Sequence, residues 1–293
     1  MASAIVLCAG FGTRLRPLTD ELPKPLVPVG DRSILEHALA GLSRAGFSEV
    51  VINAHHLASA FDRVLARSPV PLRVVVETTI RGTAGGVAGA REYLSSAPTL
   101  VWNGDILVDP PIDQLLVGLE PHSYCLGVAP RAHGEGTVGL DADGHVVRLR
   151  GERFGSEVRS GDYVGVLSLG AAVLASLPEQ GCLFGDSALP ILRAGGTVRS
   201  VPVSTPWTDA GDPAGLLAAN LEWLATRGLD GFVADGAELA RGVRLEESLV
   251  GAGARVVGQG TLTRCVVCPG ATVTAPLSDA IVAPSGRVIA AHV

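Results

Sequence analysis

Long hydrophobic runs are missing from this sequence, and none approaches the roughly 18 to 20 apolar residues that a membrane-spanning helix needs. The N-terminus has no charged leader and no cleavage site, so we expect no signal peptide. Basic residues (23) are fewer than acidic ones (29), and the net charge of −6 argues against general nucleic-acid binding. The five cysteines lack the spacing of a disulfide framework. We therefore expect a cytoplasmic protein without membrane or nucleic-acid partners.

Lysine is almost absent: 22 of the 23 basic residues are arginines, and the single lysine is Lys24. It lies in a proline-rich loop with Gly10, Gly12 and Arg14, directly after an apolar segment at 4–9 that we expect to be a buried strand. Glycines let backbone N–H groups approach a ligand, and clustered cations suit a polyphosphate. A compact ammonium reaches a crowded phosphate as a point charge. The alternative is that the single lysine lies in this loop by chance and has no role there.

The first 105 residues alternate short apolar strands with amphipathic helices, which predicts a largely parallel sheet with helices on both faces, a Rossmann-like α/β fold. In such sheets ligands bind beyond the carboxyl ends of the strands, where Gly10, Gly82 and Asp105 would lie. The strands are expected at 4–9, 50–52, 73–77 and 99–102, and further strands of a mixed sheet at 123–129, 146–149, 164–169 and 198–203. Between the first strands, one amphipathic helix is expected through Phe61 and Leu65, and another from the glycines at 82–86 to Leu94.

The pattern of the sequence changes from Phe232 onward, after a linker expected at 226–231. Helical periodicity ends, and Val or Leu recurs at about six-residue steps among small residues, as in Val233, Leu239 and Leu245. This spacing is typical of hexapeptide rungs and predicts a short left-handed β-helix. We expect a main domain at 1–228 and a β-helix domain at 229–293. So short a solenoid needs a partner surface, either the main domain or another subunit, which leaves a homo-oligomer open.

Two common phosphate-binding motifs do not fit the opening loop. A dinucleotide fingerprint would need a third glycine where Leu15 stands, and a P-loop would need Gly-Lys followed by Ser or Thr. The strings GFGTRLRPLT at 10–19 and PKPLVPV at 23–29 instead resemble the signature of the sugar-1-phosphate nucleotidyltransferases. The resemblance continues at 82–86 (GTAGG), 103–105 (NGD), 163–165 (YVG) and 207–209 (WTD). Within that family the chain is most similar to mannose-1-phosphate guanylyltransferases and related bacterial uridylyltransferases.

The resemblance implies a reaction in which a sugar-1-phosphate oxygen attacks the α-phosphorus of a nucleoside triphosphate and pyrophosphate leaves. It implies Arg14 on the outer phosphates, Lys24 on the α-phosphate and sugar phosphate, and Mg²⁺ on Asp105 and Asp209. The remaining implied contacts are with the nucleotide, at Leu7, Ala9, Gly10, Gly12, Thr13, Gly82, Thr83, Gly85, Gly86 and Asn103, and with the sugar, at Glu152, Tyr163 and Gly165. GTP and mannose 1-phosphate are the expected substrates, with UTP or dTTP as alternatives.

Several of these residues have structural alternatives. Asp105 is also a candidate for an ordinary turn acid, and Asp209 for a helix cap ahead of Pro213. The glycines at 82–86 would also suit a helix packed tightly on the sheet. The family often has a Glu-Lys pair where this chain reads Arg-Gly-Glu-Arg at 150–153, so Arg150 or Arg153 would replace the lysine.

Two other pairs of residues are expected to be structural. His55-His56 has no second ligand cluster at a matching spacing, which favours a loop or capping role over a metal site. Cys265-x-x-Cys268 has no second pair.

Two other classes remain as rivals to the enzyme: a non-catalytic relative that binds sugar nucleotides and regulates a partner, and a dinucleotide-dependent enzyme, which Leu15 disfavours.

Overall fold

The computed structural model describes residues 2–94 and 98–291, and the chain divides into two compact units. The first unit comprises 1–10, 38–58 and 62–207, and the second comprises 11–37, 59–61 and 208–293. The loop predicted to bind phosphate therefore belongs to the same unit as the C-terminal strands. The boundary expected at residue 228 divides the chain into two consecutive domains, whereas each of these units is assembled from separate segments. That boundary stays a prediction.

The first unit is built on a mixed sheet whose central strands are parallel. β1 (Ser3–Leu7) lies between β6 (Thr99–Asn103) and β4 (Val50–Ala54), and β5 (Leu72–Val76) follows β4. These strands run parallel, as expected, and each begins and ends within two residues of its predicted bounds. The carboxyl ends of β1, β4 and β6 therefore meet at one edge of the sheet.

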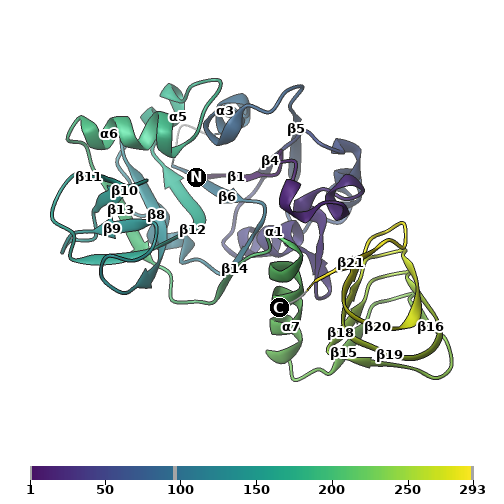
Figure 1. Cartoon of the computed structure of the whole chain (residues 1–293). Helices are drawn as coiled ribbons and strands as arrows, with labels where there is room; N and C mark the ends of the chain where they lie inside the picture. The colour runs from purple at the N-terminus through teal and green to yellow at the C-terminus, as the bar shows by residue number, and fades with distance from the viewer. Residues whose placement is uncertain (1, 95–97, 292–293) are drawn as a thin grey trace. The chain divides into compact units, whose positions relative to one another are not determined.

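Antiparallel strands extend this sheet beyond β6. β12 (Arg159–Leu169) pairs antiparallel with β6, β8 (Tyr124–Arg131) pairs antiparallel with β12, and β13 (Val198–Pro202) runs parallel to β8. Figure 1 shows these strands side by side. A smaller antiparallel extension also starts from β12 and is made of β9 (Val138–Leu140), β10 (Val146–Leu149) and β11 (Glu152–Arg153).

Helices cover both faces of the sheet. On one face, Ile5, Val51 and Val101 pack with Ala84 and Val87 of α3 and with apolar residues of α5 and α6, which Figure 1 shows along one side of the strands. Because strand side chains alternate, their neighbours face the other way, where Gly41 of α1 lies against Trp102 and the Ser168 hydroxyl donates to a carbonyl of α4. The helices are α1 (Ile34–Arg44), α2 (Asp62–Leu65), α3 (Gly82–Gly89), α4 (Ile112–Leu116), α5 (Ala171–Ser176) and α6 (Leu189–Arg193).

Two helices are shorter than the sequence predicts. The helix expected through Phe61 and Leu65 is a 3₁₀ turn (Ala58–Phe61) followed by the single turn of α2. α3 ends at Gly89 and a 3₁₀ turn (Arg91–Tyr93) follows, whereas one helix was expected to reach Leu94. Several glycines in α3 weaken it, because glycine in a helix costs about 1 kcal/mol relative to alanine.

The second unit begins with the loop after β1 and continues through a small hairpin, β2 (Pro28–Val29) and β3 (Arg32–Ser33). α1 then starts with a capping box: the Ser33 backbone N–H donates to the Glu36 carboxylate at 2.7 Å, and the Glu36 N–H donates to the Ser33 hydroxyl at 3.3 Å. Ser33 is therefore the N-terminal cap of α1.

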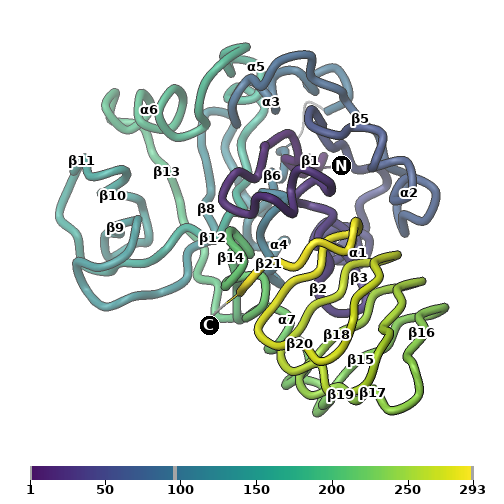
Figure 2. The backbone as a smooth tube through the Cα atoms, turned by 45° about the vertical axis from the view of Figure 1, so that its right-hand side comes forward, coloured from purple at the N-terminus to yellow at the C-terminus, as the bar shows by residue number. Residues whose placement is uncertain are grey.

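The C-terminal part of the second unit consists of stacked parallel strands, which Figures 1 and 2 show side by side. In most of the stack, partner residues are 17 positions apart, as in Gly231 with Ser248 and Arg255 with Thr272. After a register shift in the β19–β20 pair they are 15 apart, as in Leu262 with Leu277. Buried valines, leucines and alanines fill the interior of this stack. The strands are β15 (Gly231–Val233), β16 (Glu238–Leu239), β17 (Val243–Glu246), β18 (Ser248–Val250), β19 (Arg255–Val267), β20 (Thr272–Val282) and β21 (Val288–Ala290), of which β21 pairs antiparallel with β20.

Among the described residues, no helix combines the length and apolar character that crossing a membrane requires.

Candidate nucleotide and phosphate site

The loop after β1 is folded back on itself by three 3₁₀ turns, Thr13–Leu15, Leu18–Asp20 and Lys24–Leu26. Gly12 has a left-handed backbone (φ 61°), and a Cβ there would lie 2.9 Å from the Thr19 methyl carbon and 3.1 Å from the Lys24 Cβ. The Thr19 hydroxyl donates to the Gly12 carbonyl at 2.9 Å. Gly12 therefore has no room for a side chain, and its absence lets the loop close beside Lys24.

Lys24 and Arg14 converge on one carboxylate of the second unit. The Lys24 Nζ lies 3.3 Å from Asp209 Oδ1, and the Arg14 Nη2 lies 3.3 Å from Asp209 Oδ2. The Lys24 side chain is 9% exposed, whereas that of Arg14 is 63% exposed. One predicted metal ligand and two predicted phosphate-binding cations thus form a single charged cluster, with a buried ammonium at its base.

Gly211 belongs to this cluster, although the sequence analysis did not single it out. A Cβ at Gly211 would lie 2.7 Å from the Arg14 Nη2 and 2.8 Å from the Asp209 Oδ1, so a side chain there would displace the ends of these two side chains. The signal in the sequence is weak: one glycine between two aspartates, ahead of Pro213.

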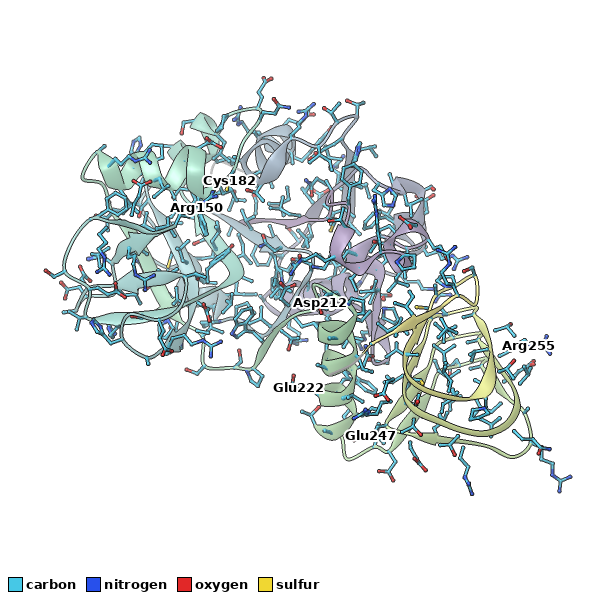
Figure 3. All side chains as sticks on the ribbon, viewed as in Figure 1. Arg150, Cys182, Asp212, Glu222, Glu247 and Arg255 are labelled. Atoms are coloured by element: carbon cyan, nitrogen blue, oxygen red, sulfur yellow. The ribbon has the colours of Figure 1, made fainter. Side chains whose placement is uncertain are left out.

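Asp209 is not the helix cap that the sequence left open as its alternative role. It ends β14 (Trp207–Asp209), and the cap of α7 (Pro213–Ala225) is Asp212, whose side chain accepts from the Gly215 N–H at 2.9 Å. Figure 3 labels Asp212 at the start of α7. Capping is done by Asp212, so the Asp209 carboxylate is turned to the two cations instead.

Asp105 lies in the first unit, in the turn between β6 and β7 (Ile106–Val108). Its neighbour Gly104 donates a backbone hydrogen bond to the Leu7 carbonyl at 2.9 Å, and Leu7 pairs with Asn103 across the two strands. Burial raises the pKa of the Cys8 thiol, and the Asp105 charge raises it further. The end of β1 and the Asn-Gly-Asp turn are therefore held together within this unit, as the parallel sheet predicts.

The glycines of α3 have reasons in the fold itself. Gly82 has φ 74°, and a Cβ there would lie 2.4 Å from the Gly181 carbonyl oxygen; a Cβ at Gly85 would lie 2.4 Å from the Glu179 carbonyl oxygen. The Thr83 hydroxyl accepts from the Leu183 N–H at 2.9 Å. Tight packing accounts for these glycines, and their contact with a nucleotide stays a proposal.

The three residues expected to face the sugar lie in two places. Tyr163 packs edge-to-face on Phe184 with ring centroids 4.8 Å apart, and burial, followed by the Asp105 charge, raises its pKa. Gly165 has φ 77°, and a Cβ there would lie 3.4 Å from the Asn103 Cβ, so Tyr163 and Gly165 lie near the Asn-Gly-Asp turn. The Glu152 carboxylate instead forms a bidentate ion pair with Arg193, whose Nη2 donates to Oε1 at 2.6 Å and whose Nε donates to Oε2 at 3.0 Å.

Of the two arginines considered as replacements for the family lysine, Arg153 pairs with Glu157 at 3.5 Å. The Arg150 Nη1 lies 3.3 Å from the Cys182 Sγ, and Figure 3 labels both residues side by side. Burial raises the pKa of Cys182, but backbone N–H groups, the Thr83 hydroxyl and Arg150 outweigh it, so the pKa is lowered overall.

His55 and the cysteines of the Cys265-x-x-Cys268 segment lie in structural surroundings. The His55 Nδ1 contacts the Glu77 carbonyl at 2.9 Å, in agreement with a loop role. Cys265 and Cys268 are buried, and all five cysteines are free. In the described part of the chain, one group of three side chains has the spacing of metal ligands, Asp141, Asp143 and His145. These residues form the turn between β9 and β10, where Asp141 Oδ1 accepts from the backbone N–H of Asp143 and from that of His145.

Residues 3–225 match a family model described as nucleotidyl transferase. A mannose-1-phosphate guanyltransferase of Emericella nidulans is 28% identical over 243 residues, which cover 76% of this chain and 64% of the relative. An N-acetylmuramate alpha-1-phosphate uridylyltransferase of Caulobacter vibrioides is 31% identical over 236 residues, covering 74% of this chain and 94% of the relative. The chain thus spans slightly less than two thirds of the first relative.

A likeness to a solved structure shows the same fold. HddC from Yersinia pseudotuberculosis, in complex with GMP-PN, superimposes with a TM-score of 0.64 at 20% identity, covering 76% of this chain and 100% of that one.

Proposed function

The chain belongs to the nucleotidyl transferase family, and on this premise we propose that it transfers a nucleoside monophosphate from a nucleoside triphosphate to a sugar 1-phosphate. The bond that forms joins a sugar-phosphate oxygen to the α-phosphorus, and the bond that breaks releases pyrophosphate. Two polyanions must meet in this reaction, so the protein has to cancel their repulsion and the charge that develops in the transition state.

The observation that carries this proposal is the cluster of Lys24, Arg14 and Asp209. A buried ammonium keeps its charge in a defined place because Asp209 contacts it at 3.3 Å. An incoming polyphosphate competes with Asp209 for both cations, and the exposed Arg14 can follow the outer phosphates while Lys24 stays at the α-phosphate. Catalysis then consists of positioning and charge neutralisation, with no covalent intermediate.

The carboxylates of Asp105 and Asp209 fit Mg²⁺, a hard cation that prefers carboxylate and phosphate oxygens. Asp209 is 39% exposed and is not used as the helix cap, so its oxygens can be shared with an ion. When bound, Mg²⁺ would supply positive charge to the phosphate oxygens. The backbone at Leu7, Ala9, Gly10, Gly12 and Thr13 would take the phosphates. Base and ribose would lie on Gly82, Thr83, Gly85, Gly86 and Asn103, and the sugar on Glu152, Tyr163 and Gly165.

GTP and mannose 1-phosphate are the substrates that we propose first. The guanyltransferase relative supports this pair, and the uridylyltransferase relative supports UTP as the alternative, followed by dTTP. The cytoplasm, where nucleoside triphosphates are plentiful, is where we place the enzyme.

The C-terminal strands support a second, structural part of the proposal, a left-handed β-helix of hexapeptide type at 229–293. Its support is the parallel register of 17 residues between successive turns, close to the roughly 18 of three hexapeptides.

Pyrophosphate release tests the proposed reaction. The chain is incubated with Mg²⁺ and each of GTP, UTP, dTTP, ATP and CTP, paired with mannose, glucose and N-acetylmuramate α-1-phosphates. We expect one pair, GTP with mannose 1-phosphate first, to release pyrophosphate and to form the matching NDP-sugar. Release that does not depend on the sugar phosphate, or no release with any pair, would contradict the proposal.

A further inference from the structure

A buried amide holds the end of β1, where the phosphate loop begins. The Asn53 Oδ1 accepts a hydrogen bond of 2.7 Å from the backbone N–H of Cys8, the first residue after β1. Asn53 lies on β4 and is 3% exposed. The backbone at Cys8, where the chain leaves β1, is therefore held by a side chain of the neighbouring strand.

The same amide is fixed in turn by a buried carboxylate. The Asn53 Nδ2 donates to the Glu77 Oε1 at 2.7 Å, and the other oxygen, Oε2, accepts from the backbone N–H of Arg81 at 3.2 Å. Glu77 is 5% exposed and follows β5 directly. Arg81 precedes Gly82, the first residue of α3. One end of the pair thus sets the start of the phosphate loop, and the other sets the start of the glycine-rich helix.

Gly86 closes the arrangement from the helix side. A Cβ at Gly86 would lie 2.5 Å from the Asn53 Nδ2 and 3.1 Å from the Glu77 Oε1, so glycine lets α3 lie directly on the pair. Each polar atom of Asn53 and Glu77 named here has a hydrogen-bond partner. A change in either residue alone therefore leaves a buried donor or acceptor without a partner, which costs free energy.

We propose that Asn53 and Glu77 are a positioning pair for nucleotide binding: they set the backbone at Leu7–Gly10 and at Gly82–Gly86 without touching the nucleotide themselves. This inference rests on the proposed function, because those two segments are the ones proposed to contact phosphate, base and ribose.

The hydrogen-bond pattern allows a swap that separates positioning from mere packing. Asn53→Asp alone sets two carboxylates against each other, and Glu77→Gln alone sets two N–H donors against each other at one contact. In the double variant, the carboxylate introduced at position 53 would accept from Cys8 and from the amide introduced at position 77, whose oxygen would accept from Arg81. Every bond is then kept, with the donor and acceptor exchanged between the two positions.

The experiment measures Kd for each of the five nucleoside triphosphates with Mg²⁺ by calorimetry, and the tightest ligand of the wild type is used for the variants. We expect each single variant to bind about tenfold more weakly, because the two backbone segments are no longer held in place in the free protein and must be ordered when the nucleotide binds. The swapped pair should return to within about threefold of the wild type. Asn53→Ser, which deletes the amide and buries no repelling pair, is measured as a variant more certain to fold, with the same loss expected.

Ser168→Ala is the matched control, because its buried hydroxyl donates to the Leu115 carbonyl within the same unit and on the opposite face of the sheet. It should unfold more easily but bind nucleotide as the wild type does. Amide exchange of Cys8 and Arg81, measured by NMR without ligand, should speed up in the single variants, recover in the swapped pair and stay unchanged in the control.

Three results would overturn the inference. If the wild type binds a triphosphate and the single variants bind it equally well, or if the swapped pair binds no better than they do, the pair is structural only and the proposed function stands. If the wild type binds none of the five triphosphates, the proposed function itself is wrong and the inference falls with it.

Discussion

Asp209 contacts the single lysine of the chain, and the family resemblance selects the same residue as a metal ligand. Lys24 stood out because it is the only lysine, and the structure puts its ammonium on the carboxylate that the family resemblance also selected. Gly211 could not be found in the same way, because its reason is a close approach by Arg14, nearly two hundred positions earlier in the chain. Composition can single out a residue, but only the fold shows which residues must stay small around it.

Lys24→Met should abolish most of the activity while leaving the protein folded. Methionine keeps the apolar stem of the buried side chain and removes only the ammonium, and Asp209, which is 39% exposed, remains solvated and keeps Arg14. We expect kcat/KM for pyrophosphate release to fall on the order of 10² to 10³-fold, as for other lost charge-stabilising donors. Steady-state kinetics and thermal unfolding of the same sample measure both effects.

Arg16→Ala serves as the control for Lys24. Arg16 lies in the same loop, is half exposed and pairs with Asp20 at 3.2 Å, away from Asp209. It should keep activity within about threefold, because an exposed ion pair contributes little. Activity of Lys24→Met close to that of the wild type would remove Lys24 from the mechanism.

Among the elements, strands were better predicted than helices. Short apolar runs located β1, β4, β5 and β6 to within two residues. β1, β4 and β6 are largely buried on both faces and therefore read as continuous hydrophobic segments, whereas β5 is partly exposed. The start of α3 was located, but its glycines could not be interpreted from sequence, since they fit carbonyls of 179–181 that no local pattern reveals.

Glu157 links the antiparallel strands β9 to β12, and its pKa makes that link dependent on pH. Its side chain is 3% exposed, and hydrogen bonds from Arg148 and then Ser160 lower its pKa from 4.5 to about 2. A lowered pKa in the folded state adds stability above about pH 4.5 and loses it as the pH falls toward 2.

Glu157→Gln should therefore destabilise the protein at pH 7 by about 2 kcal/mol, and the difference from the wild type should shrink below pH 4.5 and vanish near pH 2. Urea unfolding from pH 7 downward measures the free energy of both proteins. Glu49→Gln is the control, because its ion pair with Arg73 is more than 40% exposed on both sides and should matter little at any pH. A pH-independent difference for Glu157→Gln would mean that the loss comes from packing and not from charge.

At the scale of the whole molecule, the sequence predicted that a short C-terminal stack needs a surface to cover it. Within the second unit that surface includes the phosphate loop itself and α7. The Glu21 carboxylate accepts from the Ser285 N–H at 2.8 Å and from its hydroxyl at 2.7 Å, across 264 positions of the chain. Trp223 of α7 packs edge-to-face on Phe232 of β15, with centroids 5.2 Å apart. Which partner covers the stack could not be read from sequence, because no local pattern encodes a contact over such a separation.

Glu21 lies three residues before Lys24, so the C-terminal stack should influence activity through this contact. Glu21→Ala removes both hydrogen bonds to Ser285 and should lower kcat/KM about fivefold, since each contributes on the order of 1 kcal/mol or less to holding the loop. Ser285→Ala keeps the backbone bond and should lose about half as much on a free-energy scale, and the double variant should be no worse than Glu21→Ala alone. Glu238→Ala, which breaks an exposed pair with Arg255 in the same stack, should leave kcat/KM unchanged. Steady-state kinetics of these four variants and the wild type measure the effects on kcat/KM. If the effects of Glu21→Ala and Ser285→Ala simply add in the double variant, the loop does not rely on this contact, and the stack stabilises the chain without acting on the reaction.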